Sequence, residues 1–190
     1  MTKLTALGVF CGGSNGNDPD FLKAGKELGK ELGKKDIDLV FGYSFNGIMG
    51  AVATQAKKNG GRVIGVVTPH LRKFETPNFD LDELMVVSSM HIRKDIMFNR
   101  SDACCFLPGG IGTLDEFFEI LTMKQIGEIS KPIVLVNIGG FWDHLTGLID
   151  ETIRHGFAKE HHRKIFTVVS KVKDVIPVIE EELKSNPKYE

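Results

Sequence analysis

The chain has 190 residues, of which 42% are hydrophobic and 26% charged, and its 24 Lys and Arg residues nearly balance 25 Asp and Glu residues. This composition is typical of one domain with a sizeable core, and it excludes intrinsic disorder and a fibrous architecture. A formal net charge of −1 provides no broad basic surface for phosphate backbones, so we expect no nucleic-acid partner.

The cysteines and the N-terminal sequence indicate the cellular compartment in which the protein works. Cys11, Cys104 and Cys105 are odd in number and have no zinc-ligand spacing, which favours buried thiols in a reducing environment. The first residues lack a signal-peptide layout, and no apolar stretch approaches the ~20 residues of a membrane span. We therefore expect a cytoplasmic protein without a membrane partner.

Short apolar runs that end in glycine clusters alternate with amphipathic segments along the whole chain. In chain order we expect a strand over 4–11, a helix over 19–35, a strand over 39–41, a helix over 47–59, a strand over 62–68, a surface loop over 70–82, a strand over 84–88, a helix over 90–100, a strand over 103–107, a helix over 113–126, a strand over 133–138, a helix over 142–155, a strand over 166–169 and a helix over 174–184.

Wholly apolar strands that alternate with helices predict a parallel sheet covered on both faces, because such strands lose water on both sides. The predicted fold class is therefore α/β, a doubly wound parallel sheet. No internal repeat or low-complexity stretch interrupts the pattern, so we expect a single domain over 1–190. In such sheets ligands bind beyond the carboxyl ends of the strands, where the glycine loops lie.

The most informative glycine loop is Pro108-Gly109-Gly110-Ile111-Gly112-Thr113. Its three glycines can adopt φ > 0 and present successive N–H groups to an anion. Thr113 stands where the N-cap of the next helix belongs, and the positive end of that helix adds to the attraction for phosphate. The alternative is a tight turn that only joins strand to helix.

Other phosphate-binding motifs do not fit. Gly42 and Gly47 have the spacing of a P-loop, but Ile48 and Met49 follow them where Lys and Ser or Thr are required. The loop after the first strand lacks the dinucleotide fingerprint. We therefore expect neither ATP hydrolysis nor an NAD or FAD site.

Charged residues next to the glycine loop allow two interpretations each. Thr113-x-x-Glu116 has the form of a capping box, but the same carboxylate would lie one turn from a bound phosphate. Arg93 and Lys94 lie near the start of the helix expected over 90–100 and oppose its dipole. Either an anionic ligand or a neighbour such as Asp95 would compensate for their charge.

The segments 108–116 (PGGIGTLDE) and 90–94 (MHIRK) together resemble the signature of the LOG (Lonely Guy) family. Members of this family are cytokinin riboside 5′-monophosphate phosphoribohydrolases, sometimes labelled lysine-decarboxylase-like. The resemblance implies a Rossmann-like homodimer that cleaves the N-glycosidic bond of a nucleoside 5′-monophosphate, releasing free base and ribose 5-phosphate. It also implies that no metal or organic cofactor takes part.

The resemblance assigns roles residue by residue. Arg93 and Glu116 match the catalytic positions of the family. The matching substrate-binding positions are Ser14, Gly47, Glu75, Lys94, Gly109, Gly110, Ile111, Gly112, Thr113 and Thr122. One departure is at Gly42-Tyr43-Ser44, where the family usually has three glycines. Tyr43 and Ser44 would narrow the substrate space or add a stacking and hydrogen-bonding surface.

On this hypothesis the glycine loop fixes the 5′-phosphate, and Glu116 stabilises an oxocarbenium-like sugar and orients or deprotonates water. Arg93 holds the phosphate or stabilises the departing base. Two alternatives remain: a nucleotide or phosphorylated-cofactor carrier that does not hydrolyse its ligand, and an enzyme that transfers the phosphosugar to another acceptor.

Overall fold

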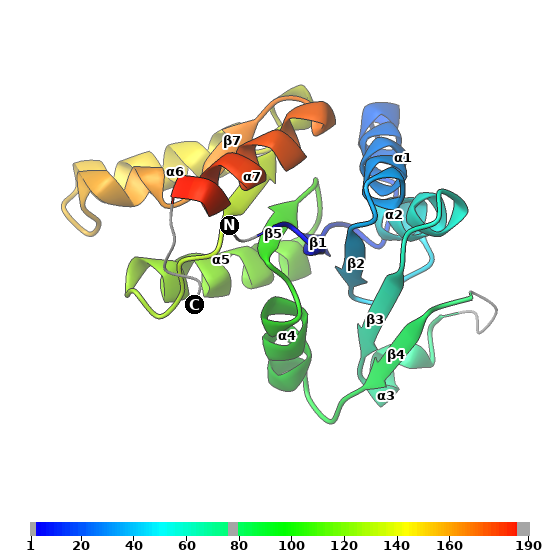
Figure 1. The fold of residues 1–190 in the computed structure, drawn as a ribbon. Helices are drawn as coiled ribbons and strands as arrows, with labels where there is room; N and C mark the ends of the chain where they lie inside the picture. The colour runs from blue at the N-terminus through cyan, green and yellow to red at the C-terminus, as the bar shows by residue number, and fades with distance from the viewer. Residues whose placement is uncertain (1–2, 76–79, 186–190) are drawn as a thin grey trace.

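The computed structural model describes residues 3–75 and 80–185. Seven parallel strands form one sheet in the order β4-β3-β2-β1-β5-β6-β7 (Figure 1). The order reverses between β1 and β5, which places the topological switch point beside β1. The strands are β1 Ala6–Phe10, β2 Asp38–Phe41, β3 Val63–Val67, β4 Glu83–Val86, β5 Ala103–Phe106, β6 Ile133–Val136 and β7 Thr167–Val169.

Helices connect the strands and cover both faces of the sheet, which confirms the doubly wound α/β prediction. One core cluster contains apolar residues of α1, α2 and α7, and the other contains residues of α4, α5 and α6. The helices are α1 Pro19–Lys34, α2 Gly47–Lys58, α3 Pro69–Arg72, α4 Met90–Asn99, α5 Ile111–Gln125, α6 Asp143–Arg154 and α7 Val175–Ser185, with 3-10 turns at Ile138–Gly140, Glu160–Lys164 and Val172–Asp174.

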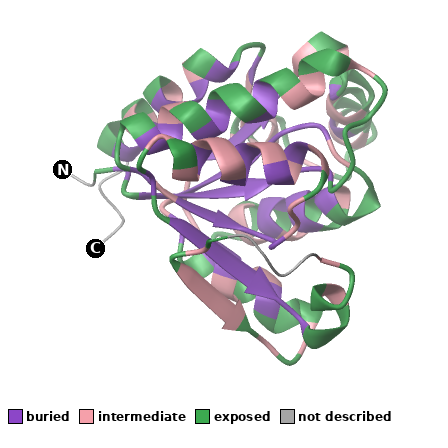
Figure 2. Cartoon of the chain, turned by 90° about the vertical axis from the view of Figure 1, so that its right-hand side faces the viewer, coloured by how far each residue is buried: buried purple, intermediate pink, exposed green. Residues whose placement is uncertain are grey.

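Burial follows the position of each strand in the sheet. The central strands β1, β5 and β6 are buried along their whole length, as their apolar sequences predicted. Strand β4 lies at the edge and is only partly buried, and Figure 2 shows it paler than its buried neighbour β3. All three cysteines are buried and free, in agreement with their predicted place in the core.

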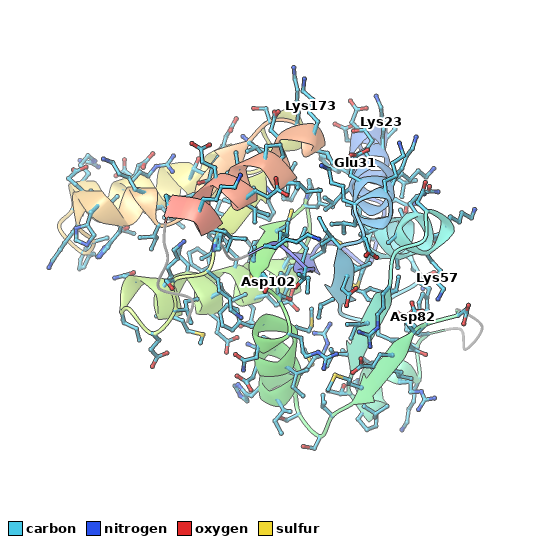
Figure 3. All side chains as sticks on the ribbon, in the orientation of Figure 1. Lys23, Glu31, Lys57, Asp82, Asp102 and Lys173 are labelled. Carbon is cyan, nitrogen blue, oxygen red and sulfur yellow. The ribbon has the colours of Figure 1, made fainter. Side chains whose placement is uncertain are left out.

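Carboxylates hold the amino edge of the sheet together. Asp102 precedes β5 (Figure 3) and accepts hydrogen bonds from Thr5 N at 2.7 Å, Thr5 Oγ1 at 2.8 Å and Ala6 N at 2.9 Å. Asp82 precedes β4 and accepts from Val63 N at 2.8 Å and from Lys57 Nζ at 2.7 Å. These backbone donors at the amino edge are thus bonded within the chain.

One local prediction is wrong. Part of the segment expected as a loop forms the short helix α3, which begins because Pro69 fits the first helical position and Thr68 Oγ1 accepts from Leu71 N at 3.4 Å. Residues 76–79 of the same segment lie outside the described residues. No helix in the described ranges is long and apolar enough to cross a membrane.

Candidate active site

The glycine loop after β5 leads directly into α5, which begins earlier than predicted. Its N-cap is Gly110, without a side-chain hydrogen bond, and its first residue is Ile111. Thr113 is therefore the third residue of the helix and not its N-cap, so the predicted capping box with Glu116 is wrong. Thr113 is buried instead, and its side chain packs over Gly109.

The glycines of this loop matter because they have no side chain. Gly109 allows a close contact with Thr113, and Gly110 and Gly112 leave open space beside the loop. None of Gly109, Gly110 and Gly112 has a positive φ, so the loop does not use this conformational freedom. A Cβ at Gly109 would lie 2.2 Å from Thr113 Oγ1, whereas a Cβ at Gly110 or Gly112 would meet nothing within 4 Å. The first N–H groups of α5 have no partner within the helix and lie at its positive end. This cradle, residues 109–113, is therefore open to an anion.

Two more loops meet the cradle at the carboxyl edge. Gly12 N donates to Pro108 O at 3.0 Å, which joins the loop after β1 to the loop after β5. Ile48 N donates to Ser14 O at 3.3 Å, and a Cβ at Gly47 would lie 2.4 Å from Ser14 N. The structure thus brings the predicted residues Ser14 and Gly47 together beside the loop that borders the cradle.

Arg93 of α4 and Glu116 of α5 form a buried ion pair, with Arg93 Nη1 3.3 Å from Glu116 Oε1. Their side chains are 6% and 10% exposed. Arg93 also donates from Nε to Val66 O at 3.1 Å and from Nη2 to Gly42 O at 3.2 Å. The backbone of β3 and of the loop after β2 therefore fixes the guanidinium, which presents its remaining edge to the carboxylate.

Burial raises the pKa of the Glu116 carboxyl from 4.5 to about 7, although the Arg93 guanidinium acts in the opposite direction. A carboxyl with a pKa near neutrality can accept or release a proton at physiological pH. The neighbouring thiol of Cys11 behaves differently, because burial and the Glu116 charge raise its pKa well above 9. Cys11 stays protonated and is no nucleophile.

Lys94 of α4 pairs with two other acids of α5. Its Nζ lies 2.9 Å from Asp115 Oδ2 and 2.5 Å from Glu119 Oε2. Arg93 and Lys94 are thus compensated by acids of the next helix, and not by Asp95, which bonds Asn99. A small cavity of about 90 Å³ between α4 and α5 connects Lys94 with Glu116; its other lining residues are Phe10, Asp95, Phe98, Glu119, Ile120 and Met123.

The two remaining predicted binding residues, Thr122 and Glu75, bond to groups outside the cradle. Thr122 is exposed, donates to Phe118 O at 2.7 Å and lines an open hollow with His91 and Lys94. Glu75 accepts hydrogen bonds from Phe45 N at 2.9 Å and Asn46 Nδ2 at 3.4 Å. Within the chain, Glu75 therefore fixes the loop between β2 and α2.

Tyr43 and Ser44 differ in what they face. The Tyr43 ring is 6% exposed and packs edge-on against Phe45 at 4.8 Å, so it lies within the protein and not at an open surface. Ser44 is half-buried, and its Oγ lies 3.5 Å from where a Cβ of Gly13 would be. Only the serine therefore faces the loop after β1.

The sequence patterns did not reveal the groups that hold Arg93. The acceptors are the backbone carbonyls of Val66 and Gly42, and a carbonyl leaves no signature in a sequence. Across the described residues, no group of three His, Cys, Asp or Glu side chains is placed to hold a metal ion. The chemistry that this site offers is an anion cradle beside a buried carboxyl of near-neutral pKa.

Known proteins resemble the chain in sequence and in fold. The family described as "Possible lysine decarboxylase" matches residues 49–179. The probable cytokinin riboside 5′-monophosphate phosphoribohydrolase LOGL9 of Oryza sativa subsp. japonica is 40% identical over 177 residues, 90% of this chain and 78% of that protein. Cytokinin riboside 5′-monophosphate phosphoribohydrolase LOG1 of Arabidopsis thaliana is 39% identical over 181 residues, 95% of this chain and 84% of that protein.

Among solved structures, the Moco carrier protein of Chlamydomonas reinhardtii superimposes with a TM-score of 0.70. Its sequence is 22% identical, and the match covers 96% of this chain and 99% of that one. At this level of identity the similarity establishes the shared fold alone.

Proposed function

Because the chain belongs to the LOG family of cytokinin riboside 5′-monophosphate phosphoribohydrolases, we propose that it hydrolyses the N-glycosidic bond of a nucleoside 5′-monophosphate. The substrate is AMP or a cytokinin riboside monophosphate, and the products are free base and ribose 5-phosphate. The observation that carries this proposal is the buried Arg93–Glu116 pair, whose carboxylate stands on the same helix as an open anion cradle.

The geometry of α5 suits a phosphorylated sugar. Glu116 lies five residues after Ile111, the first residue of the helix, which corresponds to about 7.5 Å along the axis at 1.5 Å per residue. A ribose 5-phosphate spans a comparable length. A phosphate at the free N–H groups of residues 110–113 therefore leaves C1′ near the Glu116 carboxylate, and phosphate binding orients the reaction.

The chemical step needs only side chains and water. The C1′–N bond breaks and its electron pair leaves with the base, which takes up a proton from solvent. Positive charge develops on the sugar, and the Glu116 carboxylate stabilises it. The oxygen of water then bonds to C1′ while Glu116 accepts a proton from that water.

Arg93 acts on the reaction through Glu116. Three of its N–H groups already bond within the chain, so few are left for a phosphate. Its positive charge keeps part of the Glu116 population ionised despite burial. We therefore assign Arg93 to holding and ionising the carboxylate in preference to binding the phosphate.

We further propose that two copies pair through α4 and α5 in the cytoplasm. The exposed hollow lined by His91, Lys94, Phe118 and Thr122 adjoins the cavity that reaches Glu116, so a second copy would bring Thr122 into an enclosed site. Phe118 is 39% exposed. Light scattering of Phe118→Asp should show monomers where the wild-type protein gives dimers, and monomeric wild-type protein would contradict the pairing.

The function is tested by incubating the purified protein with AMP, GMP, CMP, UMP and isopentenyladenosine monophosphate. Free base and ribose 5-phosphate are measured by chromatography, with the matching nucleosides as controls for the phosphate requirement. We expect release from an adenine nucleotide and none from adenosine. Binding without release would favour a carrier, and a ribosylated product without ribose 5-phosphate would favour transfer; either result would overturn the proposal.

A further inference from the structure

Tyr43 adopts a backbone conformation that is unfavourable for its residue type. Its φ is +65°, and among the described non-glycine residues only Asp36 shares this left-handed region. Asp tolerates that region through local hydrogen bonds, but an aromatic residue has no such compensation. A strained conformation of this kind persists only where the surrounding structure imposes it.

The Tyr43 ring is packed on two sides. The ring is almost fully buried, and it packs edge-on against Phe45 with 4.8 Å between centroids. It also contacts the bare backbone of Gly65 in β3, where a Cβ would lie only 2.9 Å from Tyr43 Cδ2. The ring is thus wedged between its own loop and the neighbouring strand.

The peptide group before Tyr43 is the one that contacts Arg93. Gly42 O accepts from Arg93 Nη2 at 3.2 Å, and a Cβ at Gly42 would lie 1.9 Å from that nitrogen. The φ angle of Tyr43 is the rotation that relates this peptide plane to the Tyr43 side chain. With the ring fixed against Gly65, the angle determines where the Gly42 carbonyl points.

We propose that Tyr43 is a positioning residue of this active site: its wedged ring aims the Gly42 carbonyl at Arg93 and thereby fixes the guanidinium against Glu116. The inference rests on the proposed function for its catalytic consequence, but the positioning itself is a property of the free protein. Tyr43 does not touch the substrate in this account.

The rest of the loop has its own anchors. Phe45 N donates to Glu75 Oε2 at 2.9 Å, and Ser44 N lies 3.3 Å from Met49 Sδ. Replacing Tyr43 by glycine therefore removes the wedge and the strain together while these contacts remain. Tyr43→Phe is the matched control, because it keeps the ring and loses only the hydroxyl.

The kinetic test compares the two variants with wild type on the nucleotide that wild type hydrolyses. For Tyr43→Gly we expect kcat to fall about tenfold with KM within about twofold, because a displaced reacting group costs rate more than phosphate binding. Tyr43→Phe should stay within about twofold of wild type. Wild-type kcat in Tyr43→Gly would overturn the proposal.

A second measurement does not depend on activity. In ¹⁵N NMR spectra, the Nη–H groups of Arg93, assigned with Arg93→Lys, should give separate signals in wild type and Tyr43→Phe because rotation is hindered. They should average in Tyr43→Gly. Separate signals in Tyr43→Gly would refute the positioning role, even if no nucleotide were hydrolysed and the proposed function had failed.

Should Tyr43→Gly not fold, Gly65→Ala gives the same test from the other side of the ring. The new Cβ pushes the ring without removing it, so we expect averaged Arg93 signals and a similar loss of kcat. Unchanged signals and rate in Gly65→Ala would overturn the proposal.

Discussion

The two edges of the sheet use carboxylates in opposite ways. At the amino edge, Asp102 accepts three hydrogen bonds from Thr5 and Ala6, all of 2.9 Å or less. At the carboxyl edge, Glu116 is buried, and its hydrogen-bond partner among the described residues is Arg93, at 3.3 Å. A carboxylate saturated with donors stabilises the fold, whereas a desolvated one with few donors keeps a reactive proton equilibrium.

The two edges also differ in how far their backbone groups are bonded within the chain. The donors of Thr5, Ala6 and Val63 at the amino edge all bond to carboxylates. At the carboxyl edge, Gly110 and Gly112 leave open space beside the first turn of α5. The amino ends of the strands therefore carry contacts that stabilise the fold, and the carboxyl ends carry the candidate active site. Substitutions at each end test this division.

The largest effect on stability should come from Arg93→Met. This change leaves the Glu116 carboxyl buried without its cation, and breaking a buried pair in this way costs about 4 kcal/mol. Urea unfolding at pH 8, where Glu116 of the wild-type protein is ionised, measures the loss. Lys94→Met is the matched control, because its partners Asp115 and Glu119 are 58% and 37% exposed, and it should cost about 1 kcal/mol. An equal loss in both variants would contradict the burial of the pair.

The amino edge should respond in stability alone. Asp102→Ala removes three charge-assisted hydrogen bonds and leaves Ala6 N without its acceptor, for which we expect a loss of about 3 kcal/mol. The rate of base release at 25 °C should stay within about twofold of wild type. A large fall in kcat with an intact fold would contradict the division between the edges.

Glu116→Gln should change the pH dependence of stability. Since the pKa of Glu116 is raised from 4.5 to about 7, the carboxyl stays protonated in the folded protein while the unfolded chain ionises. The contribution of Glu116 to the stability of wild type therefore falls as pH rises from 4.5, and the fall is complete above about 7.

The amide of the Glu116→Gln variant does not titrate, so this variant gains about 2 kcal/mol relative to wild type between pH 5 and pH 8. Urea unfolding at the two pH values measures this difference, with Asp115→Asn as the control. An equal stability difference at both pH values would show that the pKa of Glu116 is not raised.

The smallest effects separate two glycines of the cradle. Gly109→Ala places a methyl group against Thr113 and Gly12 and should cost about 2 kcal/mol. Gly112→Ala meets no atom within 4 Å and should leave thermal stability unchanged or higher, but raise KM for the nucleotide. An unchanged KM in Gly112→Ala would argue against an anion at this turn.

The sequence predicted the strands and the longer helices because apolar periodicity is a local property. Helix α3 was missed because four residues are too few to show a period, and its start depends on the cap by Thr68. The start of α5 was placed too late because Gly110 and Gly112 disfavour a helix, yet the close packing of Thr113 over Gly109 stabilises the first turn there.

The sequence predicted which residues form the candidate site, but not which of them contact one another. The motifs named Arg93 and Glu116, whereas their pairing across 23 residues depends on how α4 and α5 pack. The capping-box interpretation of Glu116 failed for the same reason, because a tertiary ion pair replaced a local bond. The burial of Tyr43 depends on the bare backbone of Gly65, a contact between a loop and a strand that no local pattern records.

The most direct measurement compares adenine release from AMP by wild type, Glu116→Gln and Asp115→Asn, two adjacent acids of which one is buried and one exposed. We predict that kcat/KM falls about a thousandfold in Glu116→Gln, while Asp115→Asn stays within about threefold of wild type. Adenine release at the wild-type rate by Glu116→Gln, or an equal loss in both variants, would contradict the role of the buried carboxylate.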